Sequence, residues 1–170
     1  DSFYVNPAAS SIHHEYRSGL LMHATSMLEL AEKTISMYPG INSDIVYTGV
    51  ILHDVGKLIE LAGPVIFHYS VEGKLLGHIS IMMGELKKAC EELSIDKEIE
   101  IQLEHIILSH HGELEFGSPV LPLTLEAMLV HLLDNLDSKM TILTKALEGI
   151  EKGELTQKVF ALDNRQFVKF

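Results

Sequence analysis

An adjacent histidine and aspartate, His53 and Asp54, lie inside a nearly uninterrupted apolar run from residue 49 to residue 57. A carboxylate that is buried without a partner is very costly, so Asp54 is expected either to have a partner or to bind a cation. Imidazole beside carboxylate is a ligand combination that suits Mn, Fe, Zn or Ni. Because single His-Asp pairs occur by chance in most proteins, a metal site here requires further ligands on faces that converge on this pair.

The rest of the chain has the hydrophobic periodicity of α-helices, and no alternating pattern predicts a sheet. Capping and turn residues divide it into five expected helices, at about residues 13–37, 44–61, 74–93, 97–111 and 124–147. The second is apolar nearly all round, so we expect it to be the buried central helix, with Gly49 and Gly56 allowing its neighbours to approach closely. We therefore predict an all-α bundle of about five main helices in a single domain of 170 residues, with a tail at 153–170 that has no clear period.

Charge and composition limit which binding partners and which cellular compartment are expected. The formal net charge is −11, from 13 basic and 24 acidic residues, which argues against a broad nucleic-acid-binding face. No apolar run reaches the length of a membrane-spanning helix, so no membrane partner is expected. The single cysteine, Cys90, cannot form an internal disulfide and favours a reducing, cytoplasmic location. Because the chain starts at Asp1 rather than at a methionine, we expect a fragment of a longer protein.

Ten histidines is an unusual number, and four of them lie on the apolar sides of expected helices that must pack together. A lone histidine on an apolar face is more often a core residue hydrogen-bonded to a carbonyl group. Asp134 alone would more simply be a solvated carboxylate, because a stripe of leucines marks another side of its helix. Four such histidines and a buried acid in one small bundle nevertheless favour a metal site. The candidate ligands are His23, His53, Asp54, His78, His110 and Asp134, with His111 as a further ligand or as the partner of one.

The order of these residues resembles the HD-domain phosphohydrolase superfamily. Three segments narrow the resemblance to the HD domain of YhaM-type 3′-5′ exoribonucleases, namely residues 72–79, 109–122 and 133–140. The similarity covers about residues 13–145, where several separate motifs agree in order and spacing. It implies an HD-domain helical bundle around a metal centre, dependence on divalent metal, and release of nucleotides from the 3′ ends of RNA or single-stranded DNA.

The resemblance also implies how the ligands divide between two metal ions. Asp54 would bridge the ions, the first held also by His23, His53 and Asp134 and the second by His78 and His110. Two cations roughly 3.5–4 Å apart can activate a water for in-line attack on phosphorus. Manganese is favoured, with Fe, Ni, Co, Zn or Mg as alternatives, and a single ion remains an alternative to two.

Further residues are assigned to catalysis and substrate binding. Asp54 is expected to be catalytic, together with Lys57, which lies one turn after His53 and could reach a phosphate oxygen. A surface lysine with an apolar stem explains Lys57 about equally well. Arg17 and Lys139 are weaker candidates for phosphate contacts. The loop at 112–122 follows a candidate ligand directly and is expected to shape the substrate mouth.

YhaM-type proteins usually carry an N-terminal OB-fold that grips the single strand, and we expect this chain to be a fragment without it. Single-stranded RNA or DNA would then be the partner of the full-length protein, and a homo-oligomer remains an open alternative. A phosphohydrolase acting on a free or cyclic nucleotide is a second hypothesis, distinguished by its product. A non-enzymatic helical interaction domain with a structural metal is a third. Structural sites are usually closed and often contain cysteines, so many candidate ligands without clustered cysteines favour an open, catalytic site.

Overall fold

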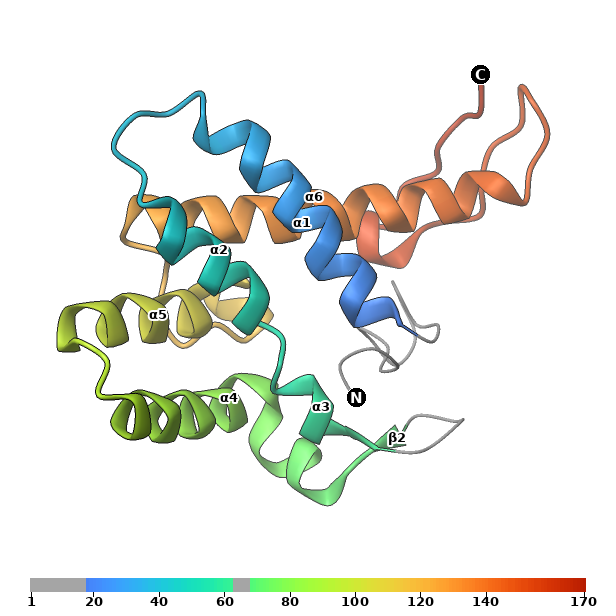
Figure 1. The fold of residues 1–170 in the computed structure, drawn as a ribbon. Helices are drawn as coiled ribbons and strands as arrows, with labels where there is room; N and C mark the ends of the chain where they lie inside the picture. Colours follow the sequence, from blue (N-terminus) through green and yellow to red (C-terminus); the bar gives the residue numbers. More distant parts are fainter. Residues whose placement is uncertain (1–17, 63–67) are drawn as a thin grey trace.

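The computed structural model describes residues 18–62 and 68–170, which form an α-helical bundle (Figure 1). Its helices are α1 (Gly19–Ile35), α2 (Ser43–Leu52), α3 (Lys57–Glu60), α4 (Val71–Leu93), α5 (Lys97–Ser109) and α6 (Leu125–Glu148). The remaining elements are the short antiparallel strands β1 (Leu61–Ala62) and β2 (His68–Tyr69) and the 3₁₀ helices η2 (Leu114–Phe116) and η3 (Phe160–Leu162). The predicted all-α class is confirmed, whereas the predicted start of the first helix at residue 13 lies outside the described residues.

Side-chain caps fix where several helices begin. Asn42 accepts the backbone N–H groups of the first turn of α2, and Asp96 accepts one at the start of α5. Thr124 caps α6 in the same way, by accepting the N–H of Ala127. These caps satisfy N–H groups that have no partner within their own helix.

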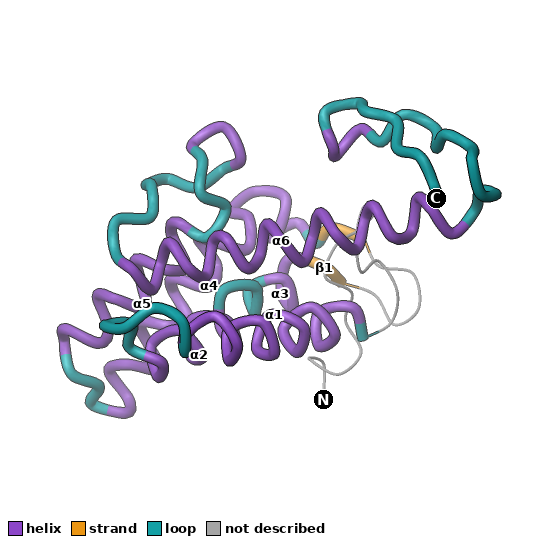
Figure 2. Tube along the Cα trace, turned by 90° about the horizontal axis from the view of Figure 1, so that it is seen from above, coloured by secondary structure: helices purple, strands orange, loops and turns teal. Residues whose placement is uncertain are grey.

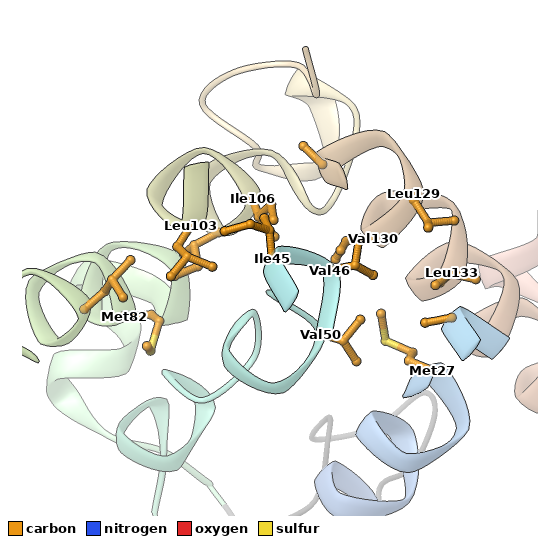
Figure 3. Packing of buried hydrophobic residues seen from close by; sticks show 14 of the residues in the cluster. Met27, Ile45, Val46, Val50, Met82, Leu103, Ile106, Leu129, Val130 and Leu133 are labelled. Carbon is orange, nitrogen blue, oxygen red and sulfur yellow. The ribbon is translucent and has the colours of Figure 1, made fainter. Parts of the chain in front are cut away.

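The core lies where α2 packs against α1, α5 and α6, while α4 packs against α3 and α5. Figure 3 shows aliphatic and methionine side chains from these helices meeting around α2. Those labelled are Met27, Ile45, Val46, Val50, Met82, Leu103, Ile106, Leu129, Val130 and Leu133. The long helix α6 runs past α1, and the segment after it turns back so that η3 contacts α6 (Figure 2). Among the helices of the described residues, none combines the length and hydrophobicity that crossing a bilayer requires.

The predicted second helix, residues 44–61, is wrong as a continuous element. α2 ends at Leu52, the chain turns through residues 53–56, and α3 then occupies only Lys57–Glu60 before β1 begins. Tight backbone bonds form this turn, with the N–H of Val55 donating to the carbonyl of Leu52. The turn brings the backbone at Gly56 against that of α4. His53 and Asp54 consequently lie at the end of the buried helix rather than in its middle.

Gly56→Ala is expected to lower the free energy of unfolding by about 1–3 kcal/mol. A Cβ at Gly56 would lie 2.2 Å from the carbonyl oxygen of His78, a backbone atom that cannot rotate away. Urea unfolding followed by circular dichroism measures the change. Gly84→Ala is the matched control, because a Cβ there has nothing within 4 Å, and should be neutral or stabilising. Equal effects of the two substitutions would contradict this account of the turn.

Candidate metal centre

The sequence-predicted ligands come from five helices or their ends and meet between them. His23 lies on α1, His53 and Asp54 follow α2, and His78 lies on α4 just after its kink. The remaining members are His110 and His111, at the end of α5, and Asp134 on α6. Lys139 is exposed on α6, beyond Asp134, and Arg17 lies outside the described residues.

The carboxylate of Asp54 lies between two groups of histidines. Its Oδ2 is 3.4 Å from Nε2 of His53 and 4.0 Å from Nε2 of His23. Its Oδ1 is 3.5 Å from Nε2 of His78 and 3.8 Å from Nε2 of His110. Each oxygen of one buried carboxylate therefore faces a different pair of imidazoles.

These residues form two clusters that could each hold a metal ion. In the first cluster, the ligand atoms of His23, His53 and Asp54 lie within 4.8 Å of one another. The second cluster consists of His78, His110 and His111, whose ligand atoms are equally close. His111 thus groups with the second cluster, where the sequence left its role open.

Three of the histidines are anchored through Nδ1 to backbone carbonyl groups. His53 bonds to the carbonyl oxygen of Val50 at 2.9 Å, and His110 to that of Ile107 at 2.8 Å. His111 bonds to the carbonyl oxygen of Phe116 at 2.7 Å. Because a carbonyl oxygen can only accept, Nδ1 carries the proton, and Nε2 keeps its lone pair in the neutral ring.

The inward-facing atoms of the clusters fit a divalent cation. Nε2 of His53, His78 and His110 and Oδ1 of Asp54 are buried without a hydrogen-bond partner. Buried polar atoms of this kind are costly and are normally satisfied. Imidazole nitrogens with their lone pairs aimed at a shared carboxylate are the donor set that first-row divalent metals accept. The simpler interpretation, a bond to a carbonyl, therefore accounts for only one ring nitrogen of His53 and of His110.

Two further carboxylates, which sequence analysis missed, contact the remaining histidines. Asp137 Oδ2 lies 2.7 Å from Nδ1 of His23. Glu60 lies 3.3 Å, measured to Oε2, from Nδ1 of His78. Asp137 follows Asp134 by almost one helical turn, a spacing that could have identified it, whereas nothing in the sequence near Glu60 signals its contact.

The interpretation of Asp134 as a solvated carboxylate is wrong. Its Oδ1 lies 3.2 Å from Nε2 of His23, and its side chain is only 16% exposed. The predicted leucine stripe is only partly correct, because Leu129 and Leu133 are buried while Leu132 and Leu136 are exposed. Val130, which lies outside the stripe, is also buried. Asp134 therefore lies on the face that packs towards α1.

Lys57 carries the charge that balances Asp54. Its Nζ lies 2.7 Å from Oδ2 of Asp54, and its side chain is 13% exposed, so it is not a solvated surface lysine. Burial alone would raise the pKa of Asp54, but Lys57, followed by His53, outweighs burial and holds that pKa well below its usual value. Burial likewise lowers the pKa of Lys57, but Asp54, with Asp134 and Glu60, outweighs burial, so the net shift of that pKa is upward. Both groups are consequently ionised at neutral pH.

The pKa values of His110 and His23 are shifted in opposite directions. Burial lowers the pKa of His110 well below its usual value, and the neighbouring His53 and His111 add to that effect. For His23 burial also lowers the pKa, but hydrogen bonds with Asp134 and Asp137 outweigh it and raise the pKa to about 9. The neutral imidazole, which His110 retains, is the form that binds metals.

The turn and loop after α5 border the second cluster. Gly112, at φ +78°, ends the turn after α5, and a Cβ there would lie 2.0 Å from the ring of His131. The Nδ1 of His131 donates to the carbonyl oxygen of His110 at 2.9 Å. Beside the cluster is a pocket of about 350 Å³, whose lining includes His78, His111, Gly117 and Pro119.

Comparisons with known proteins agree on one family. The model of the family described as HD domain matches residues 20–139. A Geobacillus protein (strain WCH70) named 3′-5′ exoribonuclease YhaM is 53% identical over 167 residues, covering 98% of this chain and 52% of that protein. The protein of the same name from Bacillus subtilis (strain 168) is 55% identical over 163 residues, covering 96% of this chain and 52% of that protein. The chain thus spans about half the length of these relatives, and no solved structure matches it.

Proposed function

The chain belongs to the HD-domain family, and from that premise we propose that it is the metal-dependent catalytic domain of a 3′-5′ exoribonuclease. Its substrate is the 3′ end of single-stranded RNA or DNA, and its reaction is hydrolysis of the terminal phosphodiester bond. The relatives named for this activity support the assignment, although they are about twice as long as this chain. The single observation that carries the proposal is the Asp54 carboxylate, whose two oxygens face different imidazoles. Among these, the Nε2 atoms of His53, His78 and His110 are buried without a hydrogen-bond partner.

The two clusters would hold two divalent ions that share Asp54. His23, His53 and Asp134 would hold the first ion together with Asp54, and Asp54 with His78, His110 and His111 would hold the second. Manganese suits this mixture of imidazole and carboxylate, although metal availability also decides which ion is bound. When bound, such ions supply Lewis-acid activation of water and of the phosphodiester.

Lys57 balances charge around this centre, and backbone groups hold the histidine rings in position. Lys57 balances Asp54 and keeps a positive charge beside the first cluster, where it would offset negative charge that develops on the phosphate group. Backbone carbonyls hold the rings of His53, His110 and His111 with Nε2 facing inward. Gly117 and Pro119, from the loop at 112–122, line the pocket beside the second cluster. This supports a role of the loop in shaping the substrate mouth.

The proposal is tested by the products formed when the chain is loaded with Mn²⁺. A 5′-labelled single-stranded RNA or DNA oligonucleotide should shorten from its 3′ end with release of mononucleotides. Bis(p-nitrophenyl) phosphate serves as a second substrate, because its hydrolysis needs the metal centre but no grip on a strand. Hydrolysis of a free or cyclic nucleotide alone would favour the more general phosphohydrolase. Stoichiometric metal with no hydrolysis of any of these phosphodiesters would contradict catalysis by this domain.

A further inference from the structure

The carboxylate of Glu60, the last residue of α3, contacts both the backbone N–H and the ring Nδ1 of His78. Oε1 accepts the backbone N–H of His78 at 3.1 Å and lies 3.4 Å from its ring Nδ1. Oε2 lies 3.3 Å from the same Nδ1. We propose that Glu60 is a positioning residue for metal binding, fixing the ring of His78 so that Nε2 is presented to the second cluster. The inference rests on the metal-binding part of the proposed function.

The backbone explains why a hydrogen-bond acceptor is needed at this point. α4 is broken at Gly77, which has φ +70° and ψ 155°, so His78 begins a new helical stretch. N–H groups at the start of a helical stretch need acceptors from outside it, and Glu60 supplies one. The ring and the backbone of His78 are thereby held by the same side chain.

Close backbone contacts hold Glu60 itself in place. Its carbonyl oxygen accepts the N–H of Ser70 at 2.9 Å, and a Cβ at Gly73 would lie only 2.4 Å from that oxygen. The Glu60 side chain is 12% exposed, so water competes little for its carboxylate. α3 and the first turns of α4 therefore form one unit that carries both residues.

The contact with Glu60 determines which nitrogen of the His78 ring carries the proton. Because a carboxylate accepts, Nδ1 of His78 donates and Nε2 keeps its lone pair. That Nε2 is buried without a hydrogen-bond partner and lies 3.5 Å from Oδ1 of Asp54. A carboxylate behind a ligating histidine fixes its tautomer and raises its basicity, and losing such a partner typically costs about 10–100-fold in metal affinity. His110 and His111 are anchored by neutral carbonyl groups at 2.8 and 2.7 Å, so within the second cluster His78 differs from them by having a charged partner behind its ring.

Glu60→Gln separates this role from simple capping of the helix. The glutamine oxygen can still accept the backbone N–H of His78, but the negative charge behind the ring is lost. Isothermal titration with Mn²⁺ and elemental analysis measure the affinity and number of ions. We expect one ion to bind as in the unsubstituted chain and the other to bind about 10–100-fold more weakly. The melting temperature measured in chelator should stay close to that of the unsubstituted chain.

Glu126→Gln is the matched control, because Glu126 accepts the backbone N–H of Asn42 at 2.9 Å. It should leave both affinities unchanged. In a His78→Gln background, Glu60→Gln should have no further effect on metal binding, because Glu60 acts through His78.

Unchanged affinities in Glu60→Gln would overturn the inference while leaving the proposed function standing. Glu60→Asp extends the test if the glutamine variant does not fold, because it keeps the charge and withdraws the carboxylate by one methylene. It should weaken the binding of the same ion, and unchanged affinities for both ions would again overturn the inference. An unsubstituted chain that binds no Mn²⁺ would instead contradict the proposed function itself.

Discussion

Asp54→Asn is expected to remove bound metal from both clusters and to lower phosphodiester hydrolysis by roughly a thousandfold or more. Asp54 is the residue whose two oxygens face the two groups of histidines. An asparagine of the same size presents an amide N–H₂ group on one side, which cannot bind a cation. Losing several kcal/mol of metal-derived transition-state stabilisation corresponds to a rate loss of this order.

Elemental analysis of the purified variant and hydrolysis of bis(p-nitrophenyl) phosphate measure the two effects. Asp163→Asn is a matched control, because Asp163 is exposed and pairs with Arg165 in the C-terminal segment, away from both clusters. It should keep the metal content and activity of the unsubstituted chain. Full stoichiometric metal together with full activity in Asp54→Asn would show that Asp54 is not the shared ligand.

Lys57→Met is expected to lower the free energy of unfolding by about 3–5 kcal/mol when metal is withheld by a chelator. The substitution keeps an apolar stem but leaves Asp54, whose side chain is 5% exposed, without the ammonium group 2.7 Å away. Added Mn²⁺ should restore most of the loss, because the cation then balances the buried carboxylate. Hydrolysis should still be slower, since a positive charge has been removed from the first cluster.

Urea unfolding in chelator and in Mn²⁺ tests this dependence on metal. Lys88→Met is the control, because Lys88 forms an exposed pair with Glu85 at 2.6 Å and surface pairs of this kind contribute little. Its unfolding should hardly change in either condition. An equal loss of stability for Lys57→Met with and without Mn²⁺ would show that the metal and Lys57 do not share Asp54.

The inward-facing histidines could be predicted from the sequence, because helical periodicity places them on the sides of the helices that pack together. His23 and His110 are fully buried, as their apolar neighbours indicated. The periodicity says nothing about where a helix is interrupted by tertiary contacts. The turn at 53–56 and the kink at Gly77 depend on the approach of α3 to α4, which separate stretches of sequence do not reveal.

The carboxylates around the histidines were harder to predict for the same reason. Asp134 was misjudged in isolation because leucines such as Leu132 suggested a core-facing stripe, yet that leucine is exposed. Glu60 contacts His78 only because the chain folds back through β1 and β2. A charged side chain that supports a ligand has no periodicity of its own, so its role emerges only from the packed structure.

The most direct test of the shared-carboxylate centre is anomalous diffraction at the manganese absorption edge, from crystals of the chain grown with Mn²⁺. Two peaks are predicted, one on each side of the Asp54 carboxylate. The first should lie against Nε2 of His23 and His53, and the second against the second cluster. Absence of any peak beside Asp54, with manganese bound elsewhere or not at all, would contradict the account.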